Sequence, residues 1–395
     1  MAKTFKYGAG IWATKTGSSL AYNDQNDNYK PLPFSVTRDS IATRVNKQGL
    51  IEVVGKDKLR IDYTDSDKGV ALLENSSTNI LTYSEDFIGS YWLKLNNVTV
   101  SAEKVISPDG TLNASQLIFD GTSGGRIEKG LTGLTQGADY SVSVYARVSS
   151  GTQVVNFGSV NDFEYTLTTE WQRLTSTEAE NDSAGYPRLK CNDAATIEVW
   201  GFQLEQNSFA TSYIPTSGST VTRAADVANG AGNEQVFNDS EGVLFANIAA
   251  LADDGTNRGI TISDGSVNNR VTMFYTNVSN AIQVKVVVGG SNSLNSYIAI
   301  SNISLYNKFA LKYKQNDFSL FVNGFELIID TSGNTFSNGT LTELAFDRGD
   351  GGEDFYGKTK EIGYYDAVLT DAELEYITSY RSLNELVTEL NLNTL

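Results

Sequence analysis

Alternation of apolar and polar side chains is the feature that most limits what this sequence can fold into. In the run YSVSVYARVSS, one side of an extended chain would carry Tyr140, Val142, Val144, Ala146 and Val148. The residues between them are mainly polar or charged. A period of two over this length is typical of a half-buried β-strand, and it predicts an all-β fold.

A second run, TIEVWGFQLEQ, continues the pattern. It places Ile197, Val199 and Gly201 on one face and Glu198, Trp200 and Phe202 on the other. Because the second face also carries large aromatic rings, we expect both faces of this strand to be covered. Turn-rich clusters such as SPDGT, FDGTSGG and NDSAGYP separate the strands, which favours a β-sandwich of jelly-roll type.

The region 228–380 repeats this organisation with a different ending. The run KFALKYKQNDFSLFVNGFELIID predicts a pair of hairpins, since Asn323-Gly324 is a strong signal for a two-residue turn. The run LTDAELEYITSY predicts a helix, because Thr370 and Glu373 have the spacing of a capping box. Leu374 belongs to its expected apolar side.

The length of 395 residues exceeds what one hydrophobic core serves. We therefore divide the chain into a β-rich N-terminal strap or attachment region at 1–77, a sandwich at 78–224, a second sandwich at 225–380, and a helical tail at 381–395. The tail carries apolar residues at helical spacing, so it either folds onto the last domain or mediates self-association.

Short strands are expected near 50–54, 59–63 and 70–73, and strands this short need a neighbouring domain to pack on.

Charge and composition exclude several functions. The net charge is −17, and we see no basic stripe, so nucleic acid is not an expected partner. The sequence has no histidine and one cysteine, Cys191, which rules out Ser-His-Asp and Cys-His catalysis and an intramolecular disulfide. We find no signal peptide and no apolar run long enough to span a membrane. We expect Cys191 to be a buried small hydrophobe.

Four aromatic residues are candidates for stacking on the apolar faces of sugars: Tyr91, Trp92, Trp171 and Trp200. The alternative is that they fill the core, as large aromatics commonly do.

The acidic loop DRGDGGED offers hard oxygen ligands for Ca²⁺ from Asp347, Asp350 and Asp354, and its glycines allow tight curvature. The alternative is a solvated turn. The adjacent pair Glu85-Asp86 is interpreted as a turn or cap, and no carboxylate pair stands out as an acid–base couple. We therefore predict a protein that is not an enzyme.

Several phrases resemble modules of tailed-bacteriophage virion proteins. FSVTRDSIATRVNKQGLIEVV resembles the segment that precedes such modules. ALLENSSTNILTYSEDF with its following YW, and VWGFQLEQNSFATSYIPTSGSTVTRAADV, resemble the start and end of a carbohydrate-binding-module-like sandwich. LFVNG and FYGKTKEIGYYDAVLTDAEL are similar to laminin-G/concanavalin-like domains.

The resemblance implies tandem β-sandwiches and a head or tail fibre or decoration protein. Such a protein is made in the host cytoplasm, lies on the virion surface, contacts other virion proteins, and presents its sandwiches to host-surface glycans. It also implies a homo-oligomer, with a trimer favoured. Two alternatives remain open: a purely structural lattice or capping component without a ligand, and a polysaccharide-degrading enzyme.

Overall fold

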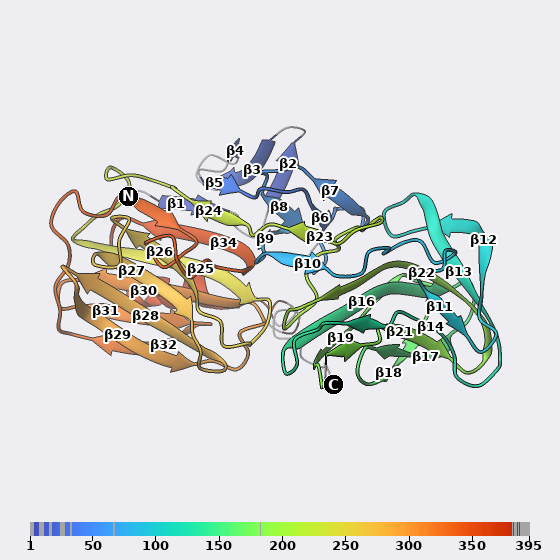
Figure 1. Ribbon diagram of the computed structural model, residues 1–395. Helices are drawn as coiled ribbons and strands as arrows, with labels where there is room; N and C mark the ends of the chain where they lie inside the picture. Colours follow the sequence, from blue (N-terminus) through green and yellow to red (C-terminus); the bar gives the residue numbers. More distant parts are fainter. Residues whose placement is uncertain are drawn as a thin grey trace. The chain divides into compact units, whose positions relative to one another are not determined.

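The structure is a computed structural model (Figure 1). It describes residues 4–7, 12–15, 18–23, 28–31, 34–65, 68–181, 183–380, 382, 385 and 387. The described elements are β-strands apart from one α-helix, α1 (Asp371–Thr378), so the all-β prediction is confirmed. Most of the predicted tail at 381–395 lies outside the described residues. No helix among them has the length and apolar character needed to cross a bilayer.

The chain divides into two compact units. Unit 1 combines Met1–Arg38, Asp57–Asn75 and Ala225–Leu395, and unit 2 combines Asp39–Lys56 and Ser76–Ala224. The chain therefore passes from unit 2 to unit 1 between 224 and 225. Parts of the region at 1–77, which we expected from sequence to form one strap, belong to both units.

Unit 2 contains two five-stranded antiparallel sheets. The first has the order β12 (Thr99–Ile106), β13 (Leu112–Asp120), β22 (Ala194–Glu205), β16 (Asp139–Val148) and β19 (Gln172–Ala179). The second has the order β11 (Leu93–Leu95), β14 (Gly125–Glu128), β21 (Arg188–Cys191), β17 (Gln153–Gly158) and β18 (Phe163–Leu167). Two-stranded pairs are β6 (Ala42–Val45) with β7 (Ile51–Val54), β10 (Ser77–Asn79) with β23 (Val221–Arg223), and β15 (Leu131–Thr132) with β20 (Ala184–Gly185).

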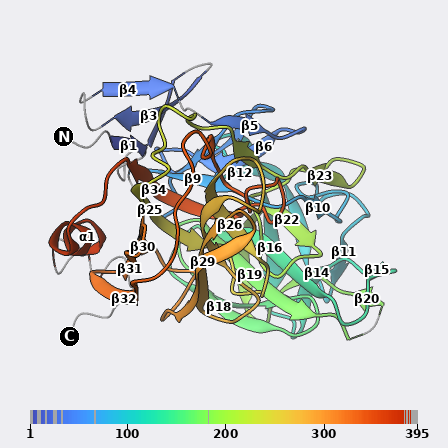
Figure 2. The same ribbon diagram turned by 90° about the vertical axis from the view of Figure 1, so that its left-hand side faces the viewer.

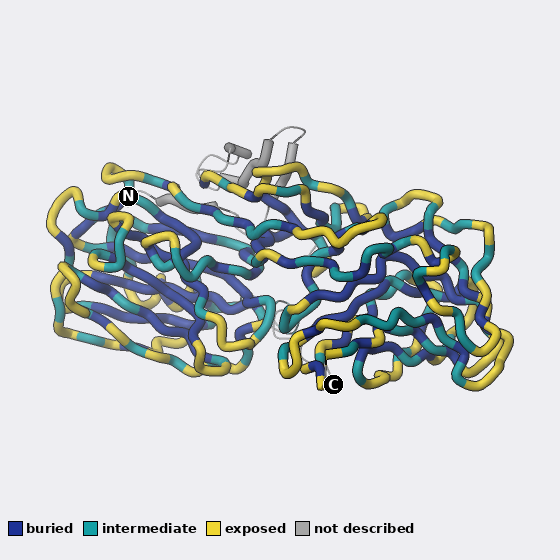
Figure 3. Tube along the Cα trace, viewed as in Figure 1, coloured by how far each residue is buried: buried dark blue, intermediate teal, exposed yellow. Residues whose placement is uncertain are grey.

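The core of unit 2 lies between these two sheets. The alternating apolar residues of β16 are buried there, together with Leu117 of β13, Phe157 of β17 and Leu189 of β21. In Figure 3 the buried positions follow the strands and the exposed ones gather at the turns. The period of two in the sequence thus reflects strands that turn one face to the core of a two-layer sandwich.

In β22, Phe202 points to the opposite side of the sheet from the one that the sequence alternation predicts. The pairing of β16 with β22 shifts register between Ser143 and Tyr145, and Gly201 there has a φ of 68°. This bulge adds a residue to one strand and reverses the facing of the residues after it. Phe202 therefore points into the main core, while Trp200 packs in a separate cluster with Tyr213.

Unit 1 contains an eight-stranded and a five-stranded sheet. The larger has the order β32 (Phe325–Asp330), β31 (Phe318–Val322), β30 (Asn307–Lys314), β25 (Glu241–Ala250), β34 (Gly357–Tyr365), β9 (Val70–Leu73) and β8 (Arg60–Asp62), with β1 (Thr4–Tyr7) also paired to β34. The smaller has the order β29 (Ser291–Ala299), β28 (Ala281–Val288), β27 (Arg270–Tyr275), β26 (Arg258–Ser263) and β33 (Glu343–Ala345). The remaining strands are β2 (Trp12–Lys15), β3 (Ser18–Asn23) and β4 (Asn28–Pro31) in one sheet, and β24 (Val227–Asn229) paired with β5 (Ser35–Thr37).

The two larger sheets of unit 1 share one apolar core, which includes Leu244 and Leu311 from the larger sheet and Ile260 and Met273 from the smaller. Helix α1 packs against β30, β31 and β32 (Figure 2), where Leu374 is fully buried.

Two local predictions are confirmed in unit 1. Thr370 caps α1 in a capping box with Glu373. The turn between β31 and β32 is Asn323-Gly324, with φ of 51° and 90°.

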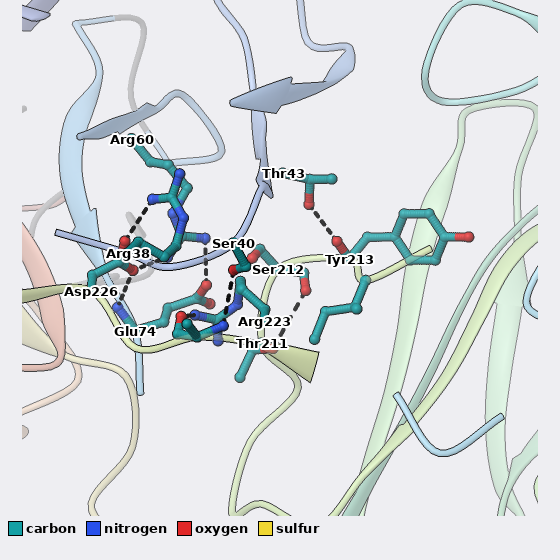
Figure 4. A network of polar contacts seen from close by, with 12 residues as sticks. Arg38, Ser40, Thr43, Arg60, Glu74, Thr211, Ser212, Tyr213, Arg223 and Asp226 are labelled. Atoms are coloured by element: carbon teal, nitrogen blue, oxygen red, sulfur yellow. Dashed lines mark hydrogen bonds and ion pairs between the residues drawn. The ribbon is translucent and has the colours of Figure 1, made fainter. Parts of the chain in front are cut away.

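Unit 1 also contains a buried group of charges, here called the ion cluster: Arg38, Arg60, Glu74 and Asp226. Arg38 Nη1 donates to Asp226 Oδ1 at 2.7 Å, and Arg60 pairs with both Asp226 and Glu74 (Figure 4). The side chains of Arg38, Arg60 and Asp226 are fully inaccessible to solvent. Carboxylates and guanidiniums buried together in this way satisfy each other's charge.

Candidate functional site

A cleft of about 590 Å³ opens on unit 2. Three parts of the unit line it: the segment 83–88, the segment 215–217, and strands β12 and β13 through Lys104 and Asn113. This volume lies within the range of about 300–1,000 Å³ common for small-molecule sites. Both wall segments belong to the sequence phrases that resemble the start and end of a sandwich.

Hydrogen bonds tie the two wall segments to each other. Tyr83 forms an isolated antiparallel bridge with Ser217. The backbone N–H of Thr216 donates to Ser84 Oγ at 2.8 Å, and Ser84 N–H donates to the Thr216 carbonyl at 3.3 Å. Trp92 Nε1 donates to the Tyr83 carbonyl at 2.9 Å. The segment TYSEDF thus forms one wall of the cleft, and the indole N–H of Trp92 fixes its backbone in place.

Glu85 is the central acidic group of the cleft. Tyr213 donates its hydroxyl to Glu85 Oε1 at 2.7 Å, and Asn113 Nδ2 donates to Oε2 at 3.2 Å. Burial raises the pKa of Glu85, and the Tyr213 hydrogen bond and the charge of Lys104 offset only part of that rise. Burial, together with the Glu85 charge, also raises the pKa of Tyr213. Glu85 is therefore a desolvated acceptor held in place by neutral donors.

Lys104 and Asn113 add complementary groups. Lys104 Nζ donates to Ser115 Oγ at 2.7 Å, and no carboxylate of the described chain lies within ion-pair distance of it. Asn113 Oδ1 is buried and has no hydrogen-bond partner within the described residues. An ammonium with spare protons and a carbonyl with spare lone pairs thus accompany the Glu85 carboxylate.

The predicted stacking residues do not gather at this cleft. The side chains of Trp92 and Trp200 are buried, with exposures of 1% and 2%, and stacking on a sugar needs an open ring face that neither provides. Trp92 packs on Phe87 and Phe202, while Trp200 packs on Tyr145 and Tyr213. Their size serves the core, as large aromatics commonly do.

Tyr91 and Trp171 are half-buried, and both are engaged within the protein. The Tyr91 hydroxyl accepts from Thr82 N–H at 3.0 Å, and Lys129 Nζ lies 4.5 Å from the ring centroid. The Arg147 guanidinium lies 4.7 Å from the Trp171 ring centroid.

The predicted calcium ligands have other partners. Buried Asp347 accepts from Gly349 N–H at 2.5 Å, Asp350 pairs with Arg348 at 2.8 Å, and Asp354 accepts from the Tyr356 hydroxyl at 3.2 Å. Within the described residues, no three acidic, His or Cys side chains are arranged to hold a metal ion. The loop is thus organised by its own hydrogen bonds and ion pairs, and calcium binding there stays a prediction.

Cys191 is buried, as expected for a lone structural cysteine, and burial raises the pKa of its thiol.

Sequence reasoning missed most of the cleft. The sequence indicates a turn or cap role for Glu85, and the structure adds hydrogen bonds to it from Tyr213 and Asn113, which lie elsewhere in the chain. Lys104 and Asn113 carry no motif, and only the register of β12 on β13 brings them to one place. No periodic signal in the sequence marks them.

Comparisons with known proteins give low similarities. No protein-family model matches the sequence, and no curated protein matches it. The chain is similar to the CBM40 of the Ruminococcus gnavus IT-sialidase, with 16% identity over 38% of this chain and 94% of that one, at a TM-score of 0.31. The tandem CBM22 domains of Paenibacillus barcinonensis Xyn10C give 11% identity over 78% of this chain and 96% of that one, with a TM-score of 0.29.

Domains LG4-5 of the mouse laminin alpha1 chain give 8% identity over 61% of this chain and 86% of that one, with a TM-score of 0.24. At identities and TM-scores this low, these likenesses carry no conclusion about ligand or activity.

Proposed function

We propose that this chain is a surface protein of a tailed-bacteriophage virion and binds a host-surface glycan, without cleaving it, through the cleft of unit 2. The observation that carries the proposal is the convergence of the Glu85 carboxylate, the Lys104 ammonium and the Asn113 carbonyl in one cleft. The virion location, contacts with other virion proteins, and assembly as a homo-oligomer, trimeric by preference, come from the sequence phrases alone.

The donor and acceptor set of the cleft suits a polyhydroxylated ligand. Each sugar hydroxyl is both a donor and an acceptor, so neighbouring hydroxyls can bond a carboxylate and an ammonium together. Glu85 and the free carbonyl of Asn113 accept, Lys104 donates, and the half-buried Tyr83 borders the cleft with an aromatic ring. We expect weak binding at each cleft, with the copy number on the particle supplying avidity.

One observation favours a second candidate function, hydrolysis of a glycan. Asn113 Nδ2 lies 3.2 Å from Glu85 Oε2 and 3.4 Å from Asp109 Oδ2, so one amide contacts two carboxylates. Burial raises the pKa of Glu85; at Asp109 burial acts in the same direction, but hydrogen bonds from Ser107 and Thr111 outweigh it and hold the pKa low. Carboxylates with divergent pKa values are typical of acid–base pairs.

The partners of Asp109 make hydrolysis the lesser candidate. Asp109 Oδ1 accepts from the Ser107 hydroxyl and from both the backbone and the hydroxyl of Thr111. These bonds close the turn between β12 and β13, which is a structural use of that carboxylate.

A glycan array probed with the full chain tests the proposed function, followed by calorimetric titration of any sugar that binds. We expect E85Q and N113A each to weaken binding about tenfold or more, because each removes a hydrogen bond to a charged or desolvated group. K56Q, a change at an exposed ion pair of unit 2, is the matched control. Undiminished affinity in both cleft variants would remove the cleft from the proposal, and no binding to any glycan would leave the purely structural role.

Incubation of the same glycans with the wild type tests the second candidate. Release of reducing ends that E85Q abolishes would make the protein a hydrolase. If a glycan binds but stays intact after incubation, hydrolysis of that glycan is excluded.

A further inference from the structure

The five-stranded sheet of unit 1 has an outer face whose residues follow from its register. Val271, Met273 and Tyr275 of β27 are in the core. The residues that alternate with them, Arg270, Thr272 and Phe274, therefore lie on the opposite, outer face. On β28, Lys285 pairs with Thr272 across the ladder, so it belongs to the same face.

The outer face continues onto β29. Asn295 pairs with Lys285, and Tyr297 pairs with Gln283. Gln283 Nε2 donates to Asn295 Oδ1 at 2.6 Å, which leaves the exposed amide nitrogen of Asn295 available. Tyr297 is 57% exposed, so it presents a ring to solvent beside these amides.

Arg270 and Lys285, here called the cationic pair, form no ion pair with a carboxylate of the described residues. Arg270 is 7% exposed; its Nη1 donates to the Arg348 carbonyl at 2.7 Å, and its Nε is buried with no partner in the described part of the chain. Lys285 Nζ lies 5.1 Å from the Phe274 ring centroid. Neither cation of the pair has a carboxylate of the described residues within ion-pair distance.

The acids closest to the cationic pair are already engaged. Arg348 pairs with Asp350 at 2.8 Å and with Glu353 at 3.2 Å. Burial, and then the Arg348 charge, lower the pKa of Arg270, and the charges of Asp350 and Glu353 offset only part of that shift. Burial, and then the Arg270 charge, lower the pKa of Lys285, and the charge of Glu353 offsets only part of it. A buried guanidinium without a carboxylate in contact is costly, and an external anion in contact with it would relieve that cost.

We propose that Arg270 and Lys285 form a binding site for the carboxylate of an acidic sugar unit, with the Asn295 amide and the Tyr297 ring contacting the rest of that sugar. A guanidinium and an ammonium side by side match the two oxygens of a carboxylate. Amides and an exposed aromatic ring supply the hydrogen bonds and the apolar contact that a sugar adds. The site goes beyond the proposed function, because it lies in unit 1 and selects by charge.

The overall charge of the chain favours a single carboxylate over a polyanion. At a net charge of −17 the long-range field repels nucleic acid, whereas a carboxylate within contact of the cationic pair feels the local charges. Screening over about 8 Å at physiological salt removes most of the distant repulsion.

Titration of the full chain with a galacturonate trisaccharide, followed by calorimetry or ligand-observed NMR, tests this proposal. We expect the acid to bind and its methyl ester to bind at least about tenfold more weakly, since esterification removes the charge. R270Q and K285Q should each weaken binding of the acid by a similar factor. K314Q removes a surface charge from the same unit, at the exposed pair with Glu241, and is the matched control.

Several results would overturn the proposal. They are equal binding of acid and ester, no binding of the acid, or unchanged affinity in K285Q. Because the Lys285 side chain is not part of the core, we expect the K285Q variant to fold. Equal binding of a sulfated trisaccharide or of single-stranded DNA would show an unselective anion surface. Loss of acid binding in E85Q would place the ligand in the cleft of unit 2 instead, which separates failure here from failure of the proposed function.

Discussion

Unit 1 holds two groups of cations in different surroundings, one paired with carboxylates and one without a carboxylate in contact among the described residues. In the ion cluster, Asp226 forms ion pairs with both Arg38 and Arg60, and Arg60 forms a second ion pair with Glu74 (Figure 4). Burial acts to lower the pKa of Arg60. The charges of the Glu74 and Asp226 carboxylates and their hydrogen bonds outweigh burial, so the pKa of Arg60 is raised. In the cationic pair, the hydrogen-bond partner of Arg270 among the described residues is a backbone carbonyl, and burial with the Arg348 charge lowers its pKa.

The difference distinguishes charge that stabilises a fold from charge that is left over for a ligand. Internal carboxylates satisfy the ion cluster, and they come from segments far apart in the sequence, so its role is to hold unit 1 together. The cationic pair sits on the outer face of a sheet, where Asp350 and Glu353 act on it at a distance but no carboxylate of the described residues forms an ion pair with it. Burial alone does not separate the two groups, because both contain arginines with little exposure.

Asp226→Asn should give the largest effect. It removes the carboxylate from two guanidiniums whose side chains are inaccessible to solvent. Breaking a buried ion pair by removing one partner costs about 3–5 kcal/mol, so we expect the free energy of unfolding of unit 1 to fall by that amount in urea denaturation. D39N, at an exposed ion pair, is the control and should leave the curve unchanged. A loss no greater than that of D39N would mean that the ion cluster is not structural.

Arg270→Met should give a much smaller change in stability. The variant loses the hydrogen bond to the Arg348 carbonyl but also removes a buried charge that the nearby acids offset only in part. A hydrogen bond from a charged group contributes about 1.5–3 kcal/mol. Because removal of the buried charge opposes that loss, we expect the free energy of unfolding to fall by less than about 1.5 kcal/mol. A loss as large as that of D226N would make Arg270 a structural residue and erase the contrast between the two groups.

The fold could be predicted from sequence wherever the signal was local. The alternation in β16, the Asn323-Gly324 turn and the Thr370–Glu373 capping box each involve neighbours in the chain, and all three are confirmed. The facing of Phe202 was wrong, because a bulge at Gly201 breaks the alternation and depends on the partner strand. The division of residues 1–77 between the two units depends on tertiary packing, which local sequence patterns do not encode.

The sites were harder to predict because their residues meet through register and not through spacing. Glu85, Lys104 and Asn113 come from three segments, and Arg270 and Lys285 from two strands. Trp92 and Trp200 were candidates because ring size is visible in a sequence, whereas burial is not. Asp347 and Asp350 were candidate ligands because acidity is visible, whereas the hydrogen bonds within their loop are not.

Glu85 offers the subtlest test, because it is a desolvated charge whose hydrogen-bond donors are neutral. Its folded pKa is raised by burial above the unfolded value. Its contribution to stability is therefore fully present below the ordinary carboxyl pKa of about 4.3 and is lost as pH rises through the raised value. Ligand binding has the opposite dependence, since the ionised carboxylate is the stronger acceptor. We expect glycan affinity to rise with pH over that window while this contribution to stability falls.

Glu85→Gln separates the two effects. At neutral pH it should leave the Tm equal or slightly higher, because the neutral amide can still accept from the Tyr213 hydroxyl and costs less to bury. It should also flatten the pH profile of glycan affinity, measured by titration from about pH 4 to about pH 8 around the carboxyl range. A lowered Tm at neutral pH, or a wild-type affinity independent of pH, would show that the ionised Glu85 stabilises unit 2 as Asp226 stabilises unit 1, rather than serving a ligand.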